Sequence, residues 1–176
     1  KLSGGAVGAG LIATSGFSSS TIAQSTDLLH RTIHSTGEKV PAVGLGTALE
    51  FGDITANYSK RKNAIKALIR EGGKVIDTSP TYSNAEKIVG RSLDELGARD
   101  KCFLATKISV RGDKKEGIDQ SIQSYKDLKT NSFNLLQVHN LRGTKAHLET
   151  INALKKEGKV SYTGVTHFRD SQNEDA

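Results

Sequence analysis

Hydrophobic and polar positions follow two alternating patterns along most of the chain. Short apolar runs, each of which predicts a buried strand, lie at residues 43–47, 74–78, 102–107, 133–139 and 160–168. The segments between these runs place apolar residues at helical spacing, so they predict crossover helices. Strands that alternate with helices in this way predict an α/β fold with parallel pairing and right-handed crossovers.

The predicted helices are marked by their ends and by their apolar faces. Residues 61–70 form the first helix. Ser83 and Glu86 have the spacing of a capping box at the start of the second helix, and Gly97 and Gly158 are expected to end the second and the fourth. The expected inner faces are Ala85, Ile88, Val89, Leu93 and Leu96 in the second helix, Ile118, Ile122, Tyr125 and Leu128 in the third, and Leu148, Ile151 and Leu154 in the fourth.

The stretch before the first strand and the end of the chain both bear on the architecture. Residues around Ser35, Thr36 and Gly37 predict a small N-terminal β-hairpin. Five strand–helix units fit either a flavodoxin-like open sheet or part of an eight-unit barrel, which needs about 250 residues in full. Asp170 and Ser171 resemble the start of a sixth helix. We therefore expect a parallel (β/α) barrel of TIM type over residues 29–176, truncated after about five of eight units.

Residues 1–28 belong to a different class of sequence. They are rich in Gly, Ala and Ser, and residues 2–25 carry no charge. Their apolar stretch is too short and glycine-rich to span a bilayer. The segment resembles the tail of a twin-arginine signal peptide, so we expect an export signal remnant and a periplasmic or exported protein. The alternative is a flexible leader on a cytoplasmic protein.

Composition narrows the classes of partner. The formal net charge is +6, but most lysines lie between the apolar positions of the predicted helices, as a solvated face requires. Aromatic residues are few and Trp is absent, so we expect no nucleic-acid partner. The single cysteine, Cys102, excludes an internal disulfide and a cysteine metal cluster. His30, His34 and His147 are scattered, and we expect no metal site.

The polar residues that end the five predicted strands carry most of the functional signal. Thr47, Asp77, Lys107, His139 and Thr166 are separated by 30, 30, 32 and 27 positions. This spacing is the length of one strand, loop and helix. Because the carboxyl ends of parallel strands meet at one rim, an acid, an amine and an imidazole are expected to converge there.

Each candidate taken alone has an ordinary structural explanation. Asp77 could be a capping or ion-paired residue, and His139 a satisfied core histidine. Lys107 could simply end a strand, and Tyr82 could cover the edge of the core. Their occurrence together at unit spacing is what indicates a functional site.

Four motifs within residues 33–168 resemble the aldo-keto reductase family. They are "VPAVGLGT", "VIDTSPTYSNAEKIVGRSL", "LATKI" and "LLQVHN", with "YTGVTHF" as weaker support. The resemblance implies that Asp77, Tyr82, Lys107 and His139 form a catalytic tetrad. It also implies hydride transfer from NADPH to the carbonyl carbon of an aldehyde or ketone, while the hydroxyl of Tyr82 protonates the carbonyl oxygen.

Elementary chemistry is consistent with these implied roles. A tyrosine hydroxyl is a weak acid near neutral pH, and a neighbouring cation makes it a better proton donor. Lys107 would be that cation, and Asp77 would hold it by a charge-assisted contact. His139 would donate a hydrogen bond that orients the carbonyl and stabilises the negative charge on its oxygen.

The same resemblance implies where the cofactor binds. It places Gly46, Thr47 and Asp77 near the cofactor, and Thr166 and His167 near the nicotinamide carboxamide. The family more often has Ser-Asn at the last two positions, and it binds the phosphates and adenosine mainly through segments after the fifth strand. The alternative is a non-catalytic α/β binding module or an inactive half-barrel fragment. In either case, an open barrel edge is expected to promote self-association.

Overall fold

The computed structural model describes residues 28–52 and 58–168 of the chain. The expected leader therefore lies outside the described residues, except for Leu28. The expected start of a sixth helix, with Asp170 and Ser171, lies outside them as well. Within the described ranges, no helix combines the length and the apolar character that crossing a membrane requires.

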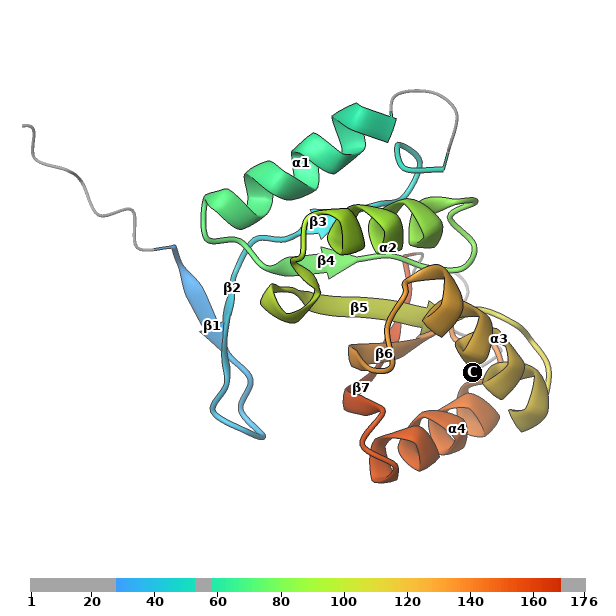
Figure 1. Ribbon diagram of the computed structural model, residues 1–176. Coiled ribbons are helices and arrows are strands. Elements are labelled where there is room, and N and C mark those ends of the chain that lie inside the picture. The colour runs from blue at the N-terminus through green and yellow to red at the C-terminus, as the bar shows by residue number, and fades with distance from the viewer. Residues whose placement is uncertain (1–27, 53–57, 169–176) are drawn as a thin grey trace, which may run out of the picture.

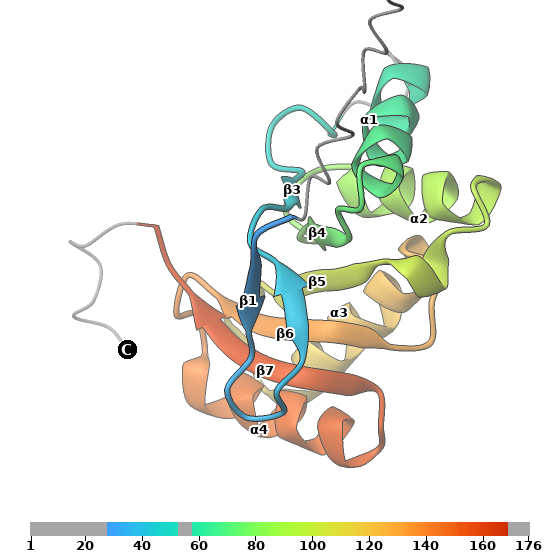
Figure 2. The same cartoon turned by 90° about the vertical axis from the view of Figure 1, so that its left-hand side faces the viewer.

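A five-stranded parallel sheet forms the centre of the structure. Its strands are β3 (Leu45–Gly46), β4 (Val75–Asp77), β5 (Phe103–Ile108), β6 (Phe133–His139) and β7 (Val160–Thr166). The strands lie side by side in chain order, from β3 to β7, and every neighbouring pair is parallel (Figure 2). This order is that of a barrel wall, so the predicted partial TIM-type fold is confirmed. The first strand is shorter than expected, since Val43 is 77% exposed and lies outside it.

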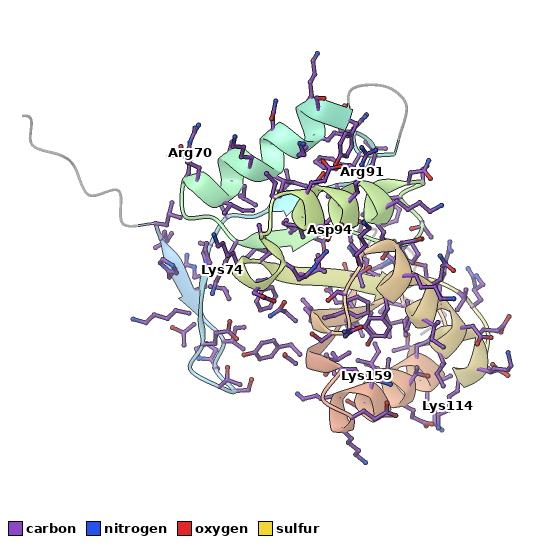
Figure 3. All side chains as sticks on the ribbon, viewed as in Figure 1. Arg70, Lys74, Arg91, Asp94, Lys114 and Lys159 are labelled. Carbon is purple, nitrogen blue, oxygen red and sulfur yellow. The ribbon has the colours of Figure 1, made fainter. Side chains whose placement is uncertain are left out.

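The α-helices of the described residues cover one side of this sheet (Figure 1). They are α1 (Tyr58–Arg70), α2 (Ala85–Glu95), α3 (Lys114–Asp127) and α4 (Thr144–Lys156), with a short 3-10 helix η1 (Arg99–Lys101) before β5. Gly97 and Gly158 end α2 and α4 with φ of 56° and 74°, as the sequence predicts. Exposed charged side chains, among them Arg70, Asp94 and Lys114, lie on the outer surface of the helices (Figure 3).

The hydrophobic core lies between the helices and the sheet. Its fully buried members include Ile65, Ile76, Ile88, Leu93, Leu136 and Ile151. The helices α2 and α3 approach closely at Gly90, where an added Cβ would meet the carbonyl oxygen of Asp127 and lie 2.7 Å from the Cα of Leu128. A side chain at this position would therefore push the two helices apart.

The predicted capping box at the start of α2 is wrong. Ser83 has a left-handed φ of 52°, the cap position belongs to Asn84, and the side chain of Asn84 makes no capping hydrogen bond. Glu86 instead turns into the protein, where it is 3% exposed. It accepts hydrogen bonds from the hydroxyls of Thr106 (2.6 Å) and Ser124 (3.1 Å), so it joins α2 to β5 and α3 rather than closing its own first turn.

The predicted inner face of α3 is wrong at two of its four positions. Ile118 and Ile122 are 41% and 45% exposed, and they line a cavity of about 470 Å³ between α3 and α4. The buried residues of the helix are Gly117, Ser121 and Ser124. Small side chains on this face allow α3 to lie close to its neighbours, which the isoleucines would prevent. Leu128 is fully buried and Tyr125 stacks on Phe133 at 4.2 Å between ring centroids, as the pattern implied.

The predicted N-terminal hairpin is present as β1 (His30–Thr32) and β2 (Lys39–Pro41), which pair antiparallel. Tyr162, in the first half of β7, donates its hydroxyl to Glu38 (2.6 Å) and lies 2.7 Å from the hydroxyl of Thr36. These contacts place the hairpin across the amino-terminal ends of the strands (Figure 2). The opposite rim, where the strands end, is left for the candidate site.

Candidate active site

A partly buried ion pair lies at the carboxyl ends of β4 and β5. The Nζ of Lys107, a residue only 4% exposed, donates to the Oδ2 of Asp77 at 2.7 Å. It also donates to the carbonyl oxygen of Thr78 at 2.8 Å. Burial of an ammonium group is costly unless it is paired and hydrogen-bonded, and both conditions are met here. The carboxyl side chain of Asp77 is 40% exposed, so the pair lies at the boundary between the core and the rim.

Tyr82 lies directly beside this pair. It follows β4 in a turn that closes when its N–H donates to the carbonyl oxygen of Ser79 at 3.0 Å. The Nζ of Lys107 lies 5.0 Å from the centroid of the tyrosine ring. The ring of His139 meets the same tyrosine edge-on, with centroids 5.9 Å apart and an angle of 85° between the planes. The fold thus brings together all four residues of the implied tetrad, whose catalytic role stays a prediction.

His139, the last residue of β6, is 8% exposed and faces a group of hydroxyls. Its Nδ1 lies 2.8 Å from the Oγ of Ser109, 3.2 Å from the Oγ of Ser79 and 3.4 Å from the Oγ1 of Thr81. Among the described residues, no hydrogen bond is formed by Nε2. The ring is therefore anchored through one nitrogen, and the other remains for a ligand.

The surroundings of His139 keep its ring neutral. Burial first, and then the positive charges of Lys107 and Arg142, lower the pKa of His139 to about 4, against the opposing effect of Asp77. A neutral imidazole carries a hydrogen on one nitrogen and a lone pair on the other. At neutral pH the histidine can therefore act as a hydrogen-bond donor without carrying a charge.

Sequence reasoning missed the hydroxyl groups around His139. Ser79 follows Asp77 by two positions, and Ser109 follows Lys107 by two positions. Residues two apart on an extended strand point to the same side, so this spacing was the available signal. Ser79 lies within the motif "VIDTSPTYSNAEKIVGRSL" and Ser109 directly follows "LATKI", but a serine at either position is too common to predict a role by itself.

The residues expected near a cofactor lie on both sides of the tetrad. Gly46 pairs with Asp77 in register, and the hydroxyl of Thr47 donates to the carbonyl oxygen of Asp77 at 3.0 Å. A Cβ added at Gly46 would meet no atom within 4 Å, so open space lies above this strand end. On the other side, Thr166 of β7 pairs with His139 of β6.

His167, directly after Thr166, carries an unusual feature. Both of its ring nitrogens are buried, and neither has a hydrogen-bond partner among the described residues. Buried polar atoms are rarely left unpaired, so a polar ligand group at this position would satisfy them. Residues 28–52 and 58–168 contain no cluster of three or more His, Cys, Asp or Glu side chains that could hold a metal ion.

Comparison with known proteins agrees with this geometry. Residues 42–176 match the family model described as "Aldo/keto reductase family". The chain belongs to the aldo/keto reductase family. It is 28% identical over 159 residues to the aldo-keto reductase YhdN of Bacillus subtilis, a match that covers 81% of this chain and 48% of the relative. It is 27% identical over 140 residues to the glyoxal reductase of the same organism, with 76% and 48% covered. The chain thus spans about half the length of these curated relatives.

Solved structures of aldo-keto reductases also match. The enzyme from Klebsiella pneumoniae in complex with NADPH has a TM-score of 0.69 at 27% identity, over 82% of this chain and 52% of the other. The protein from Brucella melitensis has a TM-score of 0.68 at 26% identity, over 84% and 57%. A thermostable aldo-keto reductase, Tm1743, matches in fold with a TM-score of 0.73 at 23% identity, over 85% and 57%. Together these matches confirm the family resemblance and the partial barrel expected from the sequence.

Proposed function

We propose that the full-length protein that carries this chain is an NADPH-dependent oxidoreductase, which reduces the carbonyl group of an aldehyde or ketone with Tyr82 as proton donor. The observation that carries the proposal is the ion pair of Lys107 and Asp77, in which Nζ lies 2.7 Å from Oδ2 and beside the ring of Tyr82. A barrel keeps its chemistry at this rim. Membership of the family and the NADPH complex of the Klebsiella relative support the choice of reaction and cofactor.

Each of the four residues has a distinct part in the proposed reaction. Bound NADPH would supply the hydride that the carbonyl carbon accepts. The hydroxyl of Tyr82 would give its proton to the carbonyl oxygen, which yields an alcohol. Lys107, held by Asp77, would stabilise the negative charge left on the phenol oxygen. His139 would donate a hydrogen bond to the carbonyl oxygen and stabilise the charge that develops there.

The residues around the tetrad fit the nicotinamide end of the cofactor. We assign Gly46 and Thr47 to one side of the ring, where the space above Gly46 is open. Thr166 and His167 would hold the carboxamide on the other side. A carboxamide offers both an acceptor oxygen and a donor amide, and so it suits the unpaired ring nitrogens of His167.

The test is a Tyr82→Phe variant of the full-length protein, assayed by NADPH oxidation against a panel of aldehydes and ketones. Loss of the proton donor is expected to lower kcat by at least about 100-fold. Tyr125→Phe is the matched control, because its hydroxyl makes one 3.4 Å contact with the carbonyl oxygen of Lys159, away from the rim. A Tyr82→Phe protein that works at the wild-type rate contradicts the proposal. A wild-type protein that reduces no carbonyl favours the alternative of a non-catalytic binding module.

We also propose that residues 1–28 direct export. The support is their composition alone, which resembles the later part of a twin-arginine signal peptide. That route carries folded proteins with bound cofactors, so it is compatible with a nicotinamide enzyme outside the cytoplasm. Cell fractionation and N-terminal sequencing would find a shortened protein in the periplasm. Recovery of the uncleaved protein from the cytoplasm alone would exclude export.

Self-association is proposed for the 176-residue chain produced alone. Within the described residues, β7 pairs with β6 on one side and has no strand on the other. An open strand edge offers unpaired N–H and C=O groups to a second chain. Light scattering is expected to give a mass above that of the monomer, 18.8 kDa. A soluble monomer at high concentration would show that the edge does not associate.

A further inference from the structure

The hydroxyls of Ser79, Thr81 and Ser109 form a cluster in the candidate site. This hydroxyl cluster has no role in the proposed reaction so far. All three oxygens converge on one atom, the Nδ1 of His139, at 2.8 to 3.4 Å. Ser79 and Ser109 are 0% and 3% exposed, and their oxygens lie 3.2 Å apart. The two serines are therefore cut off from solvent and can exchange hydrogen bonds only within the cluster.

Separate elements hold the cluster in place. Ser79 follows β4, Ser109 follows β5, and His139 ends β6. Gln120 of α3 fixes the segment after β5, because its Oε1 accepts hydrogen bonds from the N–H groups of Ser109 (2.6 Å) and Val110 (3.3 Å). The position of the Ser109 hydroxyl is thus set from two directions, by the strand and by the helix.

The direction of the hydrogen bonds follows from the balance of donors and acceptors. Each hydroxyl must place one hydrogen, and the N–H of Thr81 adds a further donor to the Oγ of Ser79 at 3.3 Å. No carbonyl or carboxylate oxygen accepts from Ser79 or Ser109 in the described residues. Without a hydrogen, Nδ1 is therefore the atom of this cluster that can accept a hydrogen bond and has none to donate. A hydrogen on Nδ1 would instead add another donor to a cluster already rich in donors.

We propose that Ser109, supported by Ser79, is a positioning residue that donates its hydroxyl to Nδ1 of His139 and so fixes the remaining ring hydrogen on Nε2. This proposal rests on the proposed reductase function, in which Nε2 is the atom that faces the carbonyl oxygen. With the hydrogen on Nε2, the histidine donates to the substrate. With the hydrogen on Nδ1, it would present a lone pair that repels the carbonyl oxygen.

The first test determines which ring nitrogen of His139 carries the hydrogen. The full-length protein is labelled with ¹⁵N-histidine, and long-range ¹H–¹⁵N spectra are recorded at pH 7, with His139 assigned from its absence in His139→Gln. The expected pattern is a protonated Nε2 and an unprotonated, hydrogen-bonded Nδ1, whose resonance moves in Ser109→Ala. A hydrogen on Nδ1, or on both nitrogens, overturns the proposal. This result does not depend on turnover, so it decides the proposal even if the protein reduces no carbonyl.

The second test reads the consequence for catalysis. Ser109→Ala is expected to lower kcat about fivefold, the effect of one neutral hydrogen bond, with KM changed less than twofold. Ser109→Thr keeps the hydroxyl and should restore kcat. Ser121→Ala is the matched control, since Ser121 is equally buried but donates to the carbonyl oxygen of Gly117. An unchanged kcat in Ser109→Ala, or no recovery in Ser109→Thr, overturns the proposal.

Discussion

The two faces of β5 differ in the kind of partner that a buried ionisable group has there. Thr106 and Lys107 are neighbours on this strand, so their side chains point to opposite sides of the sheet. On the helix side, Thr106 donates to the carboxyl group of Glu86 at 2.6 Å. On the other side, Lys107 donates to the carboxylate of Asp77 at 2.7 Å. Both contacts are short and both donors are buried, yet their electrostatic consequences differ.

The difference lies in the partner. In the described part of the chain the hydrogen-bond donors to Glu86 are the hydroxyls of Thr106 and Ser124, and its burial raises its pKa to about 7, against the smaller lowering effect of those hydroxyls. Lys107 meets an opposite charge, and the side chain of that partner is 40% exposed. The helix face thus holds an acid that is mostly neutral below about pH 7, while the inner face holds a charge pair whose carboxylate is partly exposed. Burial alone does not mark a site. What distinguishes the candidate site is a charge pair at the rim.

The largest expected effect comes from removing the charge pair on the inner face of β5. Lys107→Met removes the cation beside Tyr82 and is expected to lower kcat by about 1,000-fold. The fold should persist, because the Asp77 that remains is partly exposed and can be hydrated. Steady-state NADPH oxidation and circular dichroism measure the two outcomes. Turnover at more than a tenth of the wild-type rate in a folded Lys107→Met protein would remove the lysine from the mechanism.

Thr106→Val is the control on the other face of the same strand. It removes the hydroxyl that reaches Glu86 and should lower the melting temperature, since a buried carboxyl loses a donor. It should leave kcat within about twofold of wild type, because Thr106 points away from the rim. If both variants lost turnover equally, the two faces would not be functionally distinct.

The sequence predicted the strands and the convergence of the tetrad because both follow from regular geometry. The spacing of Asp77, Lys107 and His139 is one strand–helix unit, and parallel strands in chain order bring such positions to one rim. The strand β6 has the bounds that were expected, Phe133–His139. Long-range order was predictable here because it repeats a local unit.

The features that could not be predicted from the sequence depend on contacts between different strand–helix units. Glu86 has the spacing of a capping residue, but it turns inward to the hydroxyls of Thr106 and Ser124, which lie on other elements. Ile118 and Ile122 have helical spacing, but α3 packs with the neighbouring face, which carries the small residues Gly117, Ser121 and Ser124. The hydroxyl cluster was missed for the same reason, since Ser109 gains its meaning only when β6 places His139 beside it.

The next largest effect is the pH dependence of stability that Glu86 causes on the helix side of β5. The pKa of Glu86 is raised from 4.5 to about 7 in the folded protein, so the folded state binds more protons than the unfolded state between these values. The contribution of Glu86 to stability must therefore fall as pH rises through this window, by about 3 kcal/mol in all. Glu86→Gln mimics the neutral acid and should lose this contribution.

Denaturant unfolding of the full-length protein at pH 4.5 and pH 8 measures the difference. Wild type and Glu86→Gln should be similar in stability at the lower pH, and the variant should be the more stable at the higher pH. Equal pH dependence in the two proteins would show that Glu86 ionises in the folded state as easily as in water.

The smallest expected effect is the loss of stability when Glu86 loses one of its two hydroxyl donors. Ser124 donates to Glu86 at 3.1 Å, a longer hydrogen bond than the one from Thr106, and its donation lowers the pKa of Glu86. A hydrogen bond to a carboxylate is worth more than one to a neutral acid, so Ser124→Ala should cost about 1 kcal/mol at pH 5 and about 2 kcal/mol at pH 8. Ser121→Ala, on the same helix, removes a bond to the backbone carbonyl of Gly117 and should cost the same at both pH values. A pH-independent loss in Ser124→Ala would mean that the hydroxyl of Thr106 alone supports the ionised form.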